Sequence, residues 1–139
     1  MPGSFDLERF VKAQEGSYAQ VYSELLSGRK RTHWMWFIFP QIAGLGSRPM
    51  AVHFAISGLD EARAYLAHPL LGQRLRECAS LVNAVENREV DAIFGYPDDL
   101  KFHSSMTLFA QTTLNNTVFH QALDRYFNGR LDQATMDRL

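Results

Sequence analysis

The sequence predicts an all-α fold, a single compact domain over residues 1–139 with about seven to nine short helices. Apolar residues recur at helical spacing over 18–26 and again over 119–127. Alternating steps of four and three connect Leu71, Leu75, Cys78, Val82 and Val85, the pattern of one longer helix with a core seam. No alternating apolar and polar run is convincing enough to indicate a sheet.

The first two helices are delimited by cap and turn residues. Asp6 is suited to cap a helix that runs to about Gln14. Gly16 and Ser17 separate it from a second helix, which ends at Gly28.

The apolar run Trp34–Phe39 fits either a buried strand or a short buried helix. An isolated strand would leave its backbone groups unsatisfied, so we favour a short helix capped by Thr32 and ended by Pro40. Gly44-Leu45-Gly46 then forms a loop.

Two further helices are expected before the long one. The first is entered through Ser47 and Pro49 and ends near Gly58. Asp60 caps the second, which ends before Pro69.

The C-terminal part of the chain continues in short helices. Val90–Phe94 forms one or two turns, and Pro97 begins another helix. The helix over 119–127 ends at Asn128-Gly129, and Asp132 caps a last short helix.

The helix that begins at Pro97 has an unusual polar side. Its core face carries Phe102, Met106, Phe109 and Thr113. The opposite arc carries Lys101, Ser104, Ser105, Leu108, Gln111 and Thr112. Short hydroxyl side chains either let another helix approach closely and bond backbone carbonyls, or they converge on an oxygen-rich ligand. Both interpretations stay open from the sequence.

Composition limits the classes of function. The chain has 139 residues, 46% of them hydrophobic and 21% charged, which is typical of a globular protein. A net charge of -1 disfavours nucleic-acid and membrane-surface binding, so any anion site must be local. The single cysteine, Cys78, excludes an internal disulfide and lies on a core seam, which favours packing over reactivity.

The same features predict a cytoplasmic protein. A reducing compartment suits a chain without disulfides, and the N-terminus shows no signal peptide. The longest strongly apolar run, Trp34–Phe39, is too short to span a bilayer.

Common catalytic and cofactor motifs are missing. The sequence has no GxxxxGK[ST], GxGxxG or GxSxG motif, so no cofactor is expected. The five histidines never pair at a ligand spacing of three or four, so no metal site is expected.

The stretch from Gly28 to Gln41 joins the most basic part of the chain to the most hydrophobic part. Its aromatic residues are expected to anchor the core, and its cations suit the solvated end of a helix. An aromatic floor beside fixed cations also suits a planar ring that bears phosphate. The candidate ligand-binding residues are Arg29, Lys30, His33, Trp34, Trp36, Gln41, Gly44, Gly46, Asp98, Lys101, Ser104 and Ser105.

Several motifs together resemble one known family. They are Arg29-Lys30 with His33–Gln41, Gly44-Leu45-Gly46, Asp60-Glu61-Ala62 with Ala64–Pro69, Ile93-Phe94-Gly95 with Pro97-Asp98 and Lys101, and Ser104–Phe109. This combination is similar to a mainly bacterial family, domain of unknown function 1810, some of whose members are labelled calpastatin. The resemblance covers nearly the whole chain and implies an all-α fold, but it implies no catalytic residue.

Two hypotheses of function follow. In the first, the chain holds a pocket for an anionic, phosphate-bearing or nucleotide-like small molecule, with the four basic candidates supplying charge. Trp34 or Trp36 would stack on the ligand, and His33 or Asp98 would act as acid or base if a reaction occurs. In the alternative, the chain is a protein-interaction module whose basic turn meets an acidic partner and which has no ligand pocket.

Overall fold

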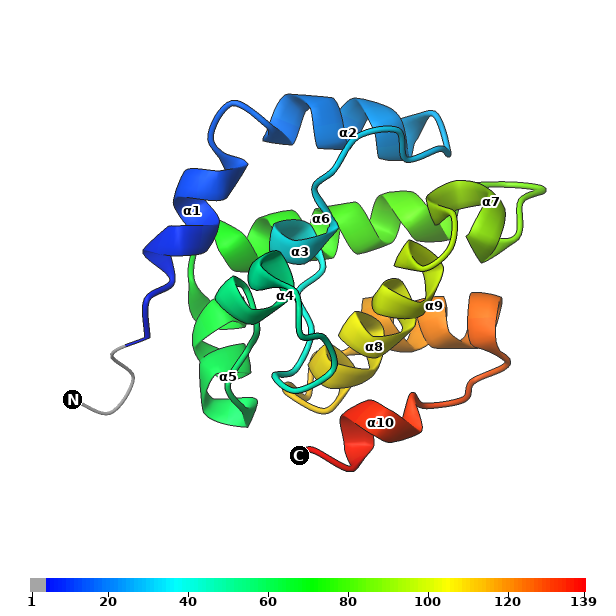
Figure 1. Cartoon of the computed structure of the whole chain (residues 1–139). Helices are drawn as coiled ribbons and strands as arrows, with labels where there is room; N and C mark the ends of the chain where they lie inside the picture. Colours follow the sequence, from blue (N-terminus) through cyan, green and yellow to red (C-terminus); the bar gives the residue numbers. More distant parts are fainter. Residues whose placement is uncertain (1–4) are drawn as a thin grey trace.

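The computed structural model describes residues 5–139, which form ten helices (Figure 1). The helices are α1 (Glu8–Gln14), α2 (Tyr18–Leu26), α3 (Met35–Ile38), α4 (Pro49–His53), α5 (Leu59–Ala67), α6 (Leu71–Ala84), α7 (Val90–Phe94), α8 (Asp98–Ala110), α9 (Thr117–Phe127) and α10 (Gln133–Met136). The all-α fold expected from the sequence is confirmed, with one helix more than the upper end of the prediction. The predicted domain range and the expected lack of a signal peptide both include residues 1–4, which lie outside the described part.

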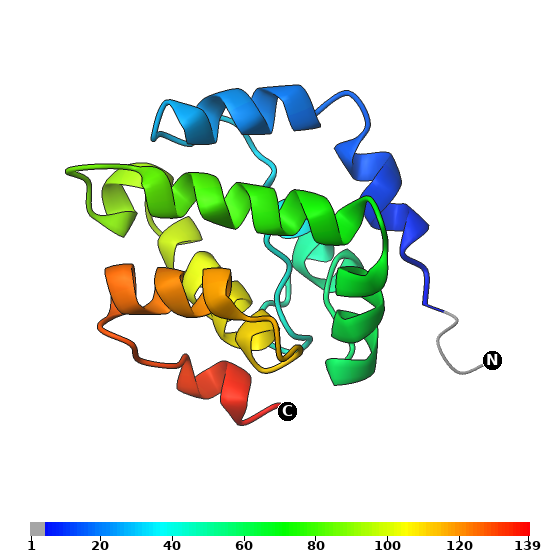
Figure 2. The same cartoon turned by 180° about the vertical axis from the view of Figure 1, so that it is seen from behind.

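The longest helix, α6, runs through the middle of the molecule. α2 packs along one side of it and α9 along another, as the two opposite views show (Figures 1 and 2). Leu71, Leu75, Cys78 and Val82 are all buried, so the predicted core seam of α6 is confirmed. This helix therefore joins the N-terminal and C-terminal parts of the fold.

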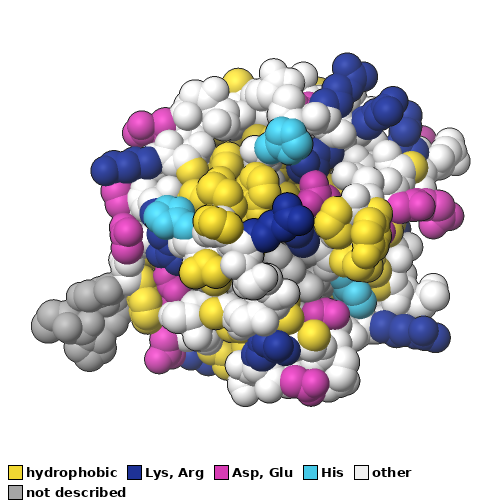
Figure 3. Space-filling model, in the orientation of Figure 1, with side chains coloured by type: hydrophobic (Ala, Val, Ile, Leu, Met, Phe, Trp, Pro, Cys, Tyr) yellow, Lys and Arg dark blue, Asp and Glu magenta, His cyan; other side chains and the backbone are white. Residues whose placement is uncertain are grey.

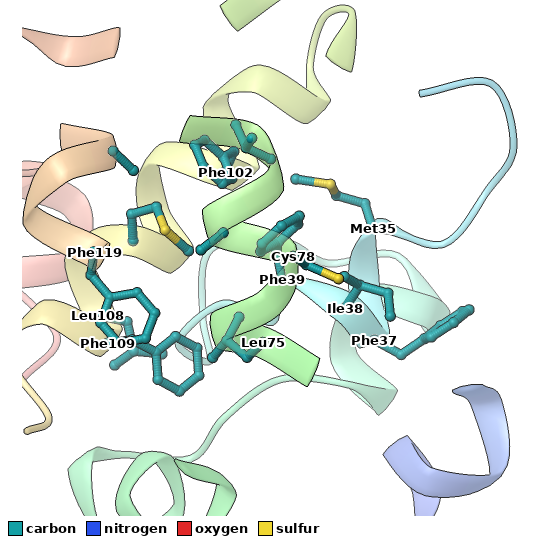
Figure 4. Packing of buried hydrophobic residues seen from close by; sticks show 14 of the residues in the cluster. Met35, Phe37, Ile38, Phe39, Leu75, Cys78, Phe102, Leu108, Phe109 and Phe119 are labelled. Atoms are coloured by element: carbon teal, nitrogen blue, oxygen red, sulfur yellow. The ribbon is translucent and has the colours of Figure 1, made fainter. Parts of the chain in front are cut away.

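Aromatic rings fill much of the core. The ring of Phe39 meets the rings of Phe94 and Phe102 edge-on, at centroid distances of 5.9 Å and 5.0 Å. Figure 4 shows Phe39 and Phe102 beside Cys78 of α6, with Phe109 and Phe119 close by. Such edge-to-face pairs add stability beyond the apolar area that they bury.

The run Trp34–Phe39 contains the short helix that the sequence favours, but Thr32 does not cap it. The cap position is Trp34, because both the N–H and the hydroxyl of Thr32 donate to Glu24.

The helix that begins at Pro49 is shorter than predicted, since α4 ends at His53 and not near Gly58. The chain after α4 extends to bond the segment 41–43. The Ile56 N–H donates to the Gln41 carbonyl at 2.8 Å, and the Ala43 N–H donates to the Ile56 carbonyl at 2.8 Å. These backbone bonds end α4 early and fix the loop that follows Gln41.

The predicted polar arc of α8 is largely buried. Phe102, Met106 and Phe109 are in the core as expected, but Ser105 and Leu108 on the opposite side are buried too. α8 contacts α5, α7, α9 and α10, so it has packing partners on several sides instead of one core face. The arc therefore fits the first of the two interpretations left open by the sequence, since neighbouring helices approach closely and the hydroxyls of Ser104 and Thr112 donate to the backbone carbonyls of Leu100 and Leu108.

The crossing of α5 and α6 depends on a glycine. A Cβ atom added at Gly72 would lie 2.1 Å from the Leu66 carbonyl oxygen, which belongs to the backbone of α5. No side chain can be placed there unless one helix moves.

Within residues 5–139, none of the helices combines the length and the apolar character needed to cross a bilayer.

Candidate functional site

The basic turn between α2 and α3 is organised by a buried carboxylate. Glu24 is 3% exposed and accepts hydrogen bonds from the N–H groups of Arg31 (2.7 Å) and Thr32 (3.0 Å). It also accepts from the Thr32 hydroxyl at 2.7 Å, from the Trp34 indole at 2.9 Å and from Gln20 at 2.8 Å. The polar and hydrophobic ends of this stretch therefore meet at one acceptor.

These donors control the charge state of Glu24. Burial alone raises the pKa of a carboxyl group, but the hydrogen bonds outweigh it and lower the pKa of Glu24 to about 2. The carboxylate is therefore ionised at neutral pH and holds the turn in place.

Two lysines share the carboxylate of Asp98. Lys30 Nζ lies 2.8 Å from Asp98 Oδ2, and Lys101 Nζ lies 3.5 Å from Asp98 Oδ1. Lys30 Nζ is 5.2 Å from the centroid of the Trp34 ring, and Lys101 Nζ is 5.2 Å from that of the Trp36 ring. The basic turn and the start of α8, which supply most of the candidate residues, thus meet in space. At this point two lysine ammonium groups face one carboxylate.

A groove lies next to Lys101, with a volume of about 320 Å³. We call it the Lys101 groove. Its lining residues are Gln41, Leu45, Gly46, Ala51, Pro97, Leu100, Lys101, His103, Ser104, Asp132 and Ala134. Figure 3 shows hydrophobic, basic, acidic and histidine side chains adjoining one another on the face that carries α3, α4 and α8 in Figure 1.

Four of the predicted site residues line this groove. Gln41 and Gly46 come from the loop after α3, and Lys101 and Ser104 come from α8. The N–H groups of Leu45 and Gly46 donate to no acceptor in the described part of the chain. The groove wall therefore combines one ammonium group and one carboxylate, that of Asp132, with polar side chains.

The hydroxyl of Ser104 already has partners inside the protein. Its oxygen lies 3.2 Å from the Leu100 carbonyl and 3.0 Å from Asp132 Oδ2. The same Asp132 oxygen accepts from the N–H (3.2 Å) and the hydroxyl (2.6 Å) of Thr135. Asp132 is therefore the predicted cap of α10, and it also attaches α10 to α8 as a wall of the groove.

Other predicted residues lie outside the groove. Trp34 is 2% exposed and packs in the core, so its ring offers no free face to a ligand, whereas Trp36 is partly exposed. Ser105 is fully buried, and its hydroxyl has no hydrogen-bond partner among residues 5–139. Arg29 and His33 are exposed and do not line the groove.

Gly44 lies next to the C-terminal segment and not in the groove. A Cβ atom added there would be 2.9 Å from Arg138 Nε, and Arg138 Nη2 donates to the Gly44 carbonyl at 3.4 Å. This contact ties the residues after α10 to the loop that supplies Gly46.

Sequence reasoning missed His103 and Asp132 as lining residues. His103 stacks on Phe127 at a centroid distance of 4.0 Å, and its Nε2 lies 2.8 Å from the Arg130 carbonyl. The i, i+3, i+7 spacing of Pro97, Leu100 and Ser104 could have indicated the α8 side of the groove. No sequence signal places α10 opposite it.

Two comparisons with known proteins give matches over nearly the whole chain. A family model described as "Protein of unknown function (DUF1810)" matches residues 4–139. The crystal structure of the conserved hypothetical protein Rv1873 from Mycobacterium tuberculosis is similar, with 56% sequence identity and a TM-score of 0.96. That match covers 97% of this chain and 96% of the other. No curated protein matches the sequence.

Proposed function

Because this chain belongs to the DUF1810 family of proteins of unknown function, its role has to be inferred from its own residues, and we propose that it binds a small anionic molecule in the Lys101 groove. The match to the family model confirms the resemblance that the motifs indicate, but the description of the family names no ligand. A phosphate-bearing or nucleotide-like molecule fits the groups present.

The unequal distances around Asp98 carry this proposal. Lys30 lies at a close 2.8 Å and neutralises Asp98, whereas Lys101 is held loosely at 3.5 Å. The side chain of Lys101 is 25% exposed, so its ammonium can turn to a ligand without leaving a buried carboxylate unpaired. Lysine is well suited to phosphate as a compact charge.

The remaining groove residues supply weaker contacts. Gln41 can donate or accept, and Leu45 and Gly46, whose N–H groups have no acceptor in the described part of the chain, line the same groove. Trp36, under the Lys101 ammonium, extends an aromatic surface beside the groove. A volume of about 320 Å³ is at the small end of ligand pockets, which favours a mononucleotide or sugar phosphate over a dinucleotide.

The proposal concerns binding and assigns no reaction. His33 and Asp98, the acid–base candidates from the sequence, do not line the groove. Asp98 is in addition occupied by two ammonium groups.

A thermal-shift screen tests the proposal directly. Nucleoside monophosphates, ADP-ribose and sugar phosphates are each added in excess, and a ligand present at about 100 times its Kd should stabilise the fold by about 2.7 kcal/mol. The Lys101→Ala variant should lose most of this stabilisation. The residues that line the groove include no other lysine or arginine to pair with the negative charge of the ligand.

Lys12→Ala is the matched control, since Lys12 is exposed on α1 and far in sequence from the groove. It should respond to the ligand as the wild type does. If no compound stabilises the protein, or if Lys101→Ala is stabilised equally, the proposal fails. The protein-interaction alternative then gains weight, because Arg29 and Arg31 are exposed and have no carboxylate within 4.0 Å in residues 5–139.

A further inference from the structure

The turn between α1 and α2 passes beside the N-terminal half of α6 (Figures 1 and 2). Residues of this turn, of α2 and of α6 line a second hollow. Its volume is about 750 Å³, and we call it the Arg74 groove. It shares no lining residue with the Lys101 groove, and it is lined by Gln14, Glu15, Gly16, Tyr18, Ala19, Tyr22 and Arg74.

The guanidinium of Arg74 is held in place by uncharged groups. Its Cζ lies 4.4 Å from the centroid of the Tyr18 ring, and its Nη1 donates to Gln14 Oε1 at 3.1 Å. Gln14 is 1% exposed and is itself fixed, because its Nε2 donates to the Phe37 carbonyl at 2.8 Å. Arg74 is thus oriented before any ligand arrives, which reduces the entropy cost of binding.

This cation is partly buried and has no acidic partner. No carboxylate oxygen in residues 5–139 lies within 4.0 Å of it, whereas Arg9 on α1 lies 3.0 Å from Glu61. Glu77, one turn along α6, accepts a hydrogen bond from the Tyr18 hydroxyl. Of the five N–H donors of Arg74, one has an acceptor in the described part of the protein.

We propose that the Arg74 groove binds a small carboxylate that has an aromatic or apolar body. The carboxylate pairs with the planar guanidinium, for which a two-oxygen anion is the geometric match. The body of the ligand lies against Ala19 and Tyr22, which is 38% exposed.

The surrounding charges select a singly charged ligand. Glu15 lines the groove and Glu77 accepts a hydrogen bond from Tyr18, so two carboxylates lie near the groove, although neither comes within 4.0 Å of Arg74. A second negative charge on the ligand would be repelled by them, which disfavours a phosphate monoester relative to a carboxylate. The ligand class therefore differs from that proposed for the Lys101 groove.

An NMR titration of the whole chain tests this inference with three probes: benzoate, phenyl phosphate and the neutral benzyl alcohol. Benzoate should shift the amide signals of Gly16, Tyr18 and Ala19 and the side-chain signal of Arg74. Phenyl phosphate should bind more weakly than benzoate, and benzyl alcohol more weakly than both. Equal shifts from benzyl alcohol would overturn the charge pairing, and tighter binding of phenyl phosphate would overturn the choice of carboxylate.

Substitutions then identify the anchor. Arg74→Met should weaken benzoate binding by about tenfold or more, since a hydrogen-bonded charge pair is lost, and Arg74→Lys should give an intermediate loss. Arg76→Met is the matched control, because Arg76 is on the same helix and lies over Phe119 instead of the groove. Benzoate shifts that are unchanged in Arg74→Met would overturn the proposal.

Tyr22→Ala gives a test that does not disturb the Arg74 network, since Tyr22 is exposed and lies outside that network. It should weaken benzoate binding through lost apolar contact, and unchanged affinity would contradict the assigned position of the ligand body. Lys101→Ala should leave benzoate binding unchanged, so failure at one groove does not affect the conclusion at the other.

Discussion

Glu24 explains why the most basic turn of the chain joins its most hydrophobic run. The carboxylate receives N–H and hydroxyl donors from the turn on one side and the Trp34 indole from the core on the other. A single buried acceptor thus fixes both the backbone after α2 and the ring that begins the aromatic segment. The side chains of Arg29 and Arg31 in this turn are exposed, whereas that of Lys30 is nearly buried and pairs with Asp98.

Replacement of Glu24 by Gln should destabilise the protein and change its acid response. The pKa of Glu24 is lowered from 4.5 to about 2 in the fold, so its ionisation contributes up to about 3 kcal/mol above pH 4.5. Because the folded pKa lies below the unfolded value, this contribution disappears as the pH falls from 4.5 toward 2.

Urea unfolding at several pH values measures this effect. The wild type should lose stability steeply over that acid range, and Glu24→Gln should be less stable at pH 7 with a shallower acid loss. Glu15→Gln is the control, since Glu15 is exposed. Parallel pH profiles for wild type and Glu24→Gln would show that the carboxylate does not hold the turn.

The sequence did not reveal this role of Glu24. The residue lies beside Val21 and Leu25 on a helix whose apolar face was recognised, but the donors come from a later turn. A carboxylate inside an apolar face is a usable signal that buried donors lie nearby. The identity of these donors depends on the path of the chain after Gly28, which brings Arg31, Thr32 and Trp34 to Glu24.

At the scale of elements, the helices predicted best are those with one core side. The seam of α6 and the apolar spacing of α9 were confirmed, since each packs on neighbours in the way that the periodicity assumes. In α8 the predicted core residues are buried, but the opposite arc is buried too, because several helices surround α8 and periodicity then gives little contrast between its faces. The end of α4 was missed because backbone bonds from a distant segment decide it.

The crossing of α5 and α6 leaves no space for a side chain at Gly72. Gly72→Ala should destabilise the protein by about 3 kcal/mol, because the new methyl group meets backbone that can move only with its helix. The change is read as a lower thermal midpoint by circular dichroism.

Gly58→Ala serves for comparison. A Cβ atom at Gly58 meets nothing within 4 Å, and its φ of 170° is extended backbone that other residues adopt. This variant should stay within about 1 kcal/mol of the wild type. Similar stabilities for the two variants would mean that the α5–α6 crossing can accommodate a methyl group at residue 72.

For the whole molecule, the lone cysteine reports on global unfolding. Cys78 lies on the central helix, and burial raises the pKa of its thiol to about 12. Its reaction with a disulfide reagent at pH 8 should therefore be at least about 10³-fold slower in the native protein than in denaturant.

A thiol moved to the surface of the same helix provides the control. The double variant Cys78→Ala, Ser80→Cys exposes the sulfur, because Ser80 is exposed on α6, and it should react rapidly in the folded state. Rapid reaction of native wild-type protein would instead show that α6 opens locally, against its central position in the fold.

The candidate site was predicted in part. Lys101, Ser104, Gln41 and Gly46 were identified from their chemistry, and the fold brings them to one groove. Trp34 and Ser105 were assigned to the ligand, but the fold uses both in its interior. Residue type indicates what a side chain can bind, whereas exposure depends on packing that one sequence pattern does not specify.

The crossing at Gly72 also has a consequence for how the sequence can change during evolution. Any chain that keeps these two helices at this separation must keep an amino acid without a side chain at the point of contact, whatever else drifts around it. Selection on shape alone, with no ligand involved, would keep glycine at this position through long divergence. An invariant glycine in this fold therefore indicates a functional site only if a Cβ atom at that position would have room.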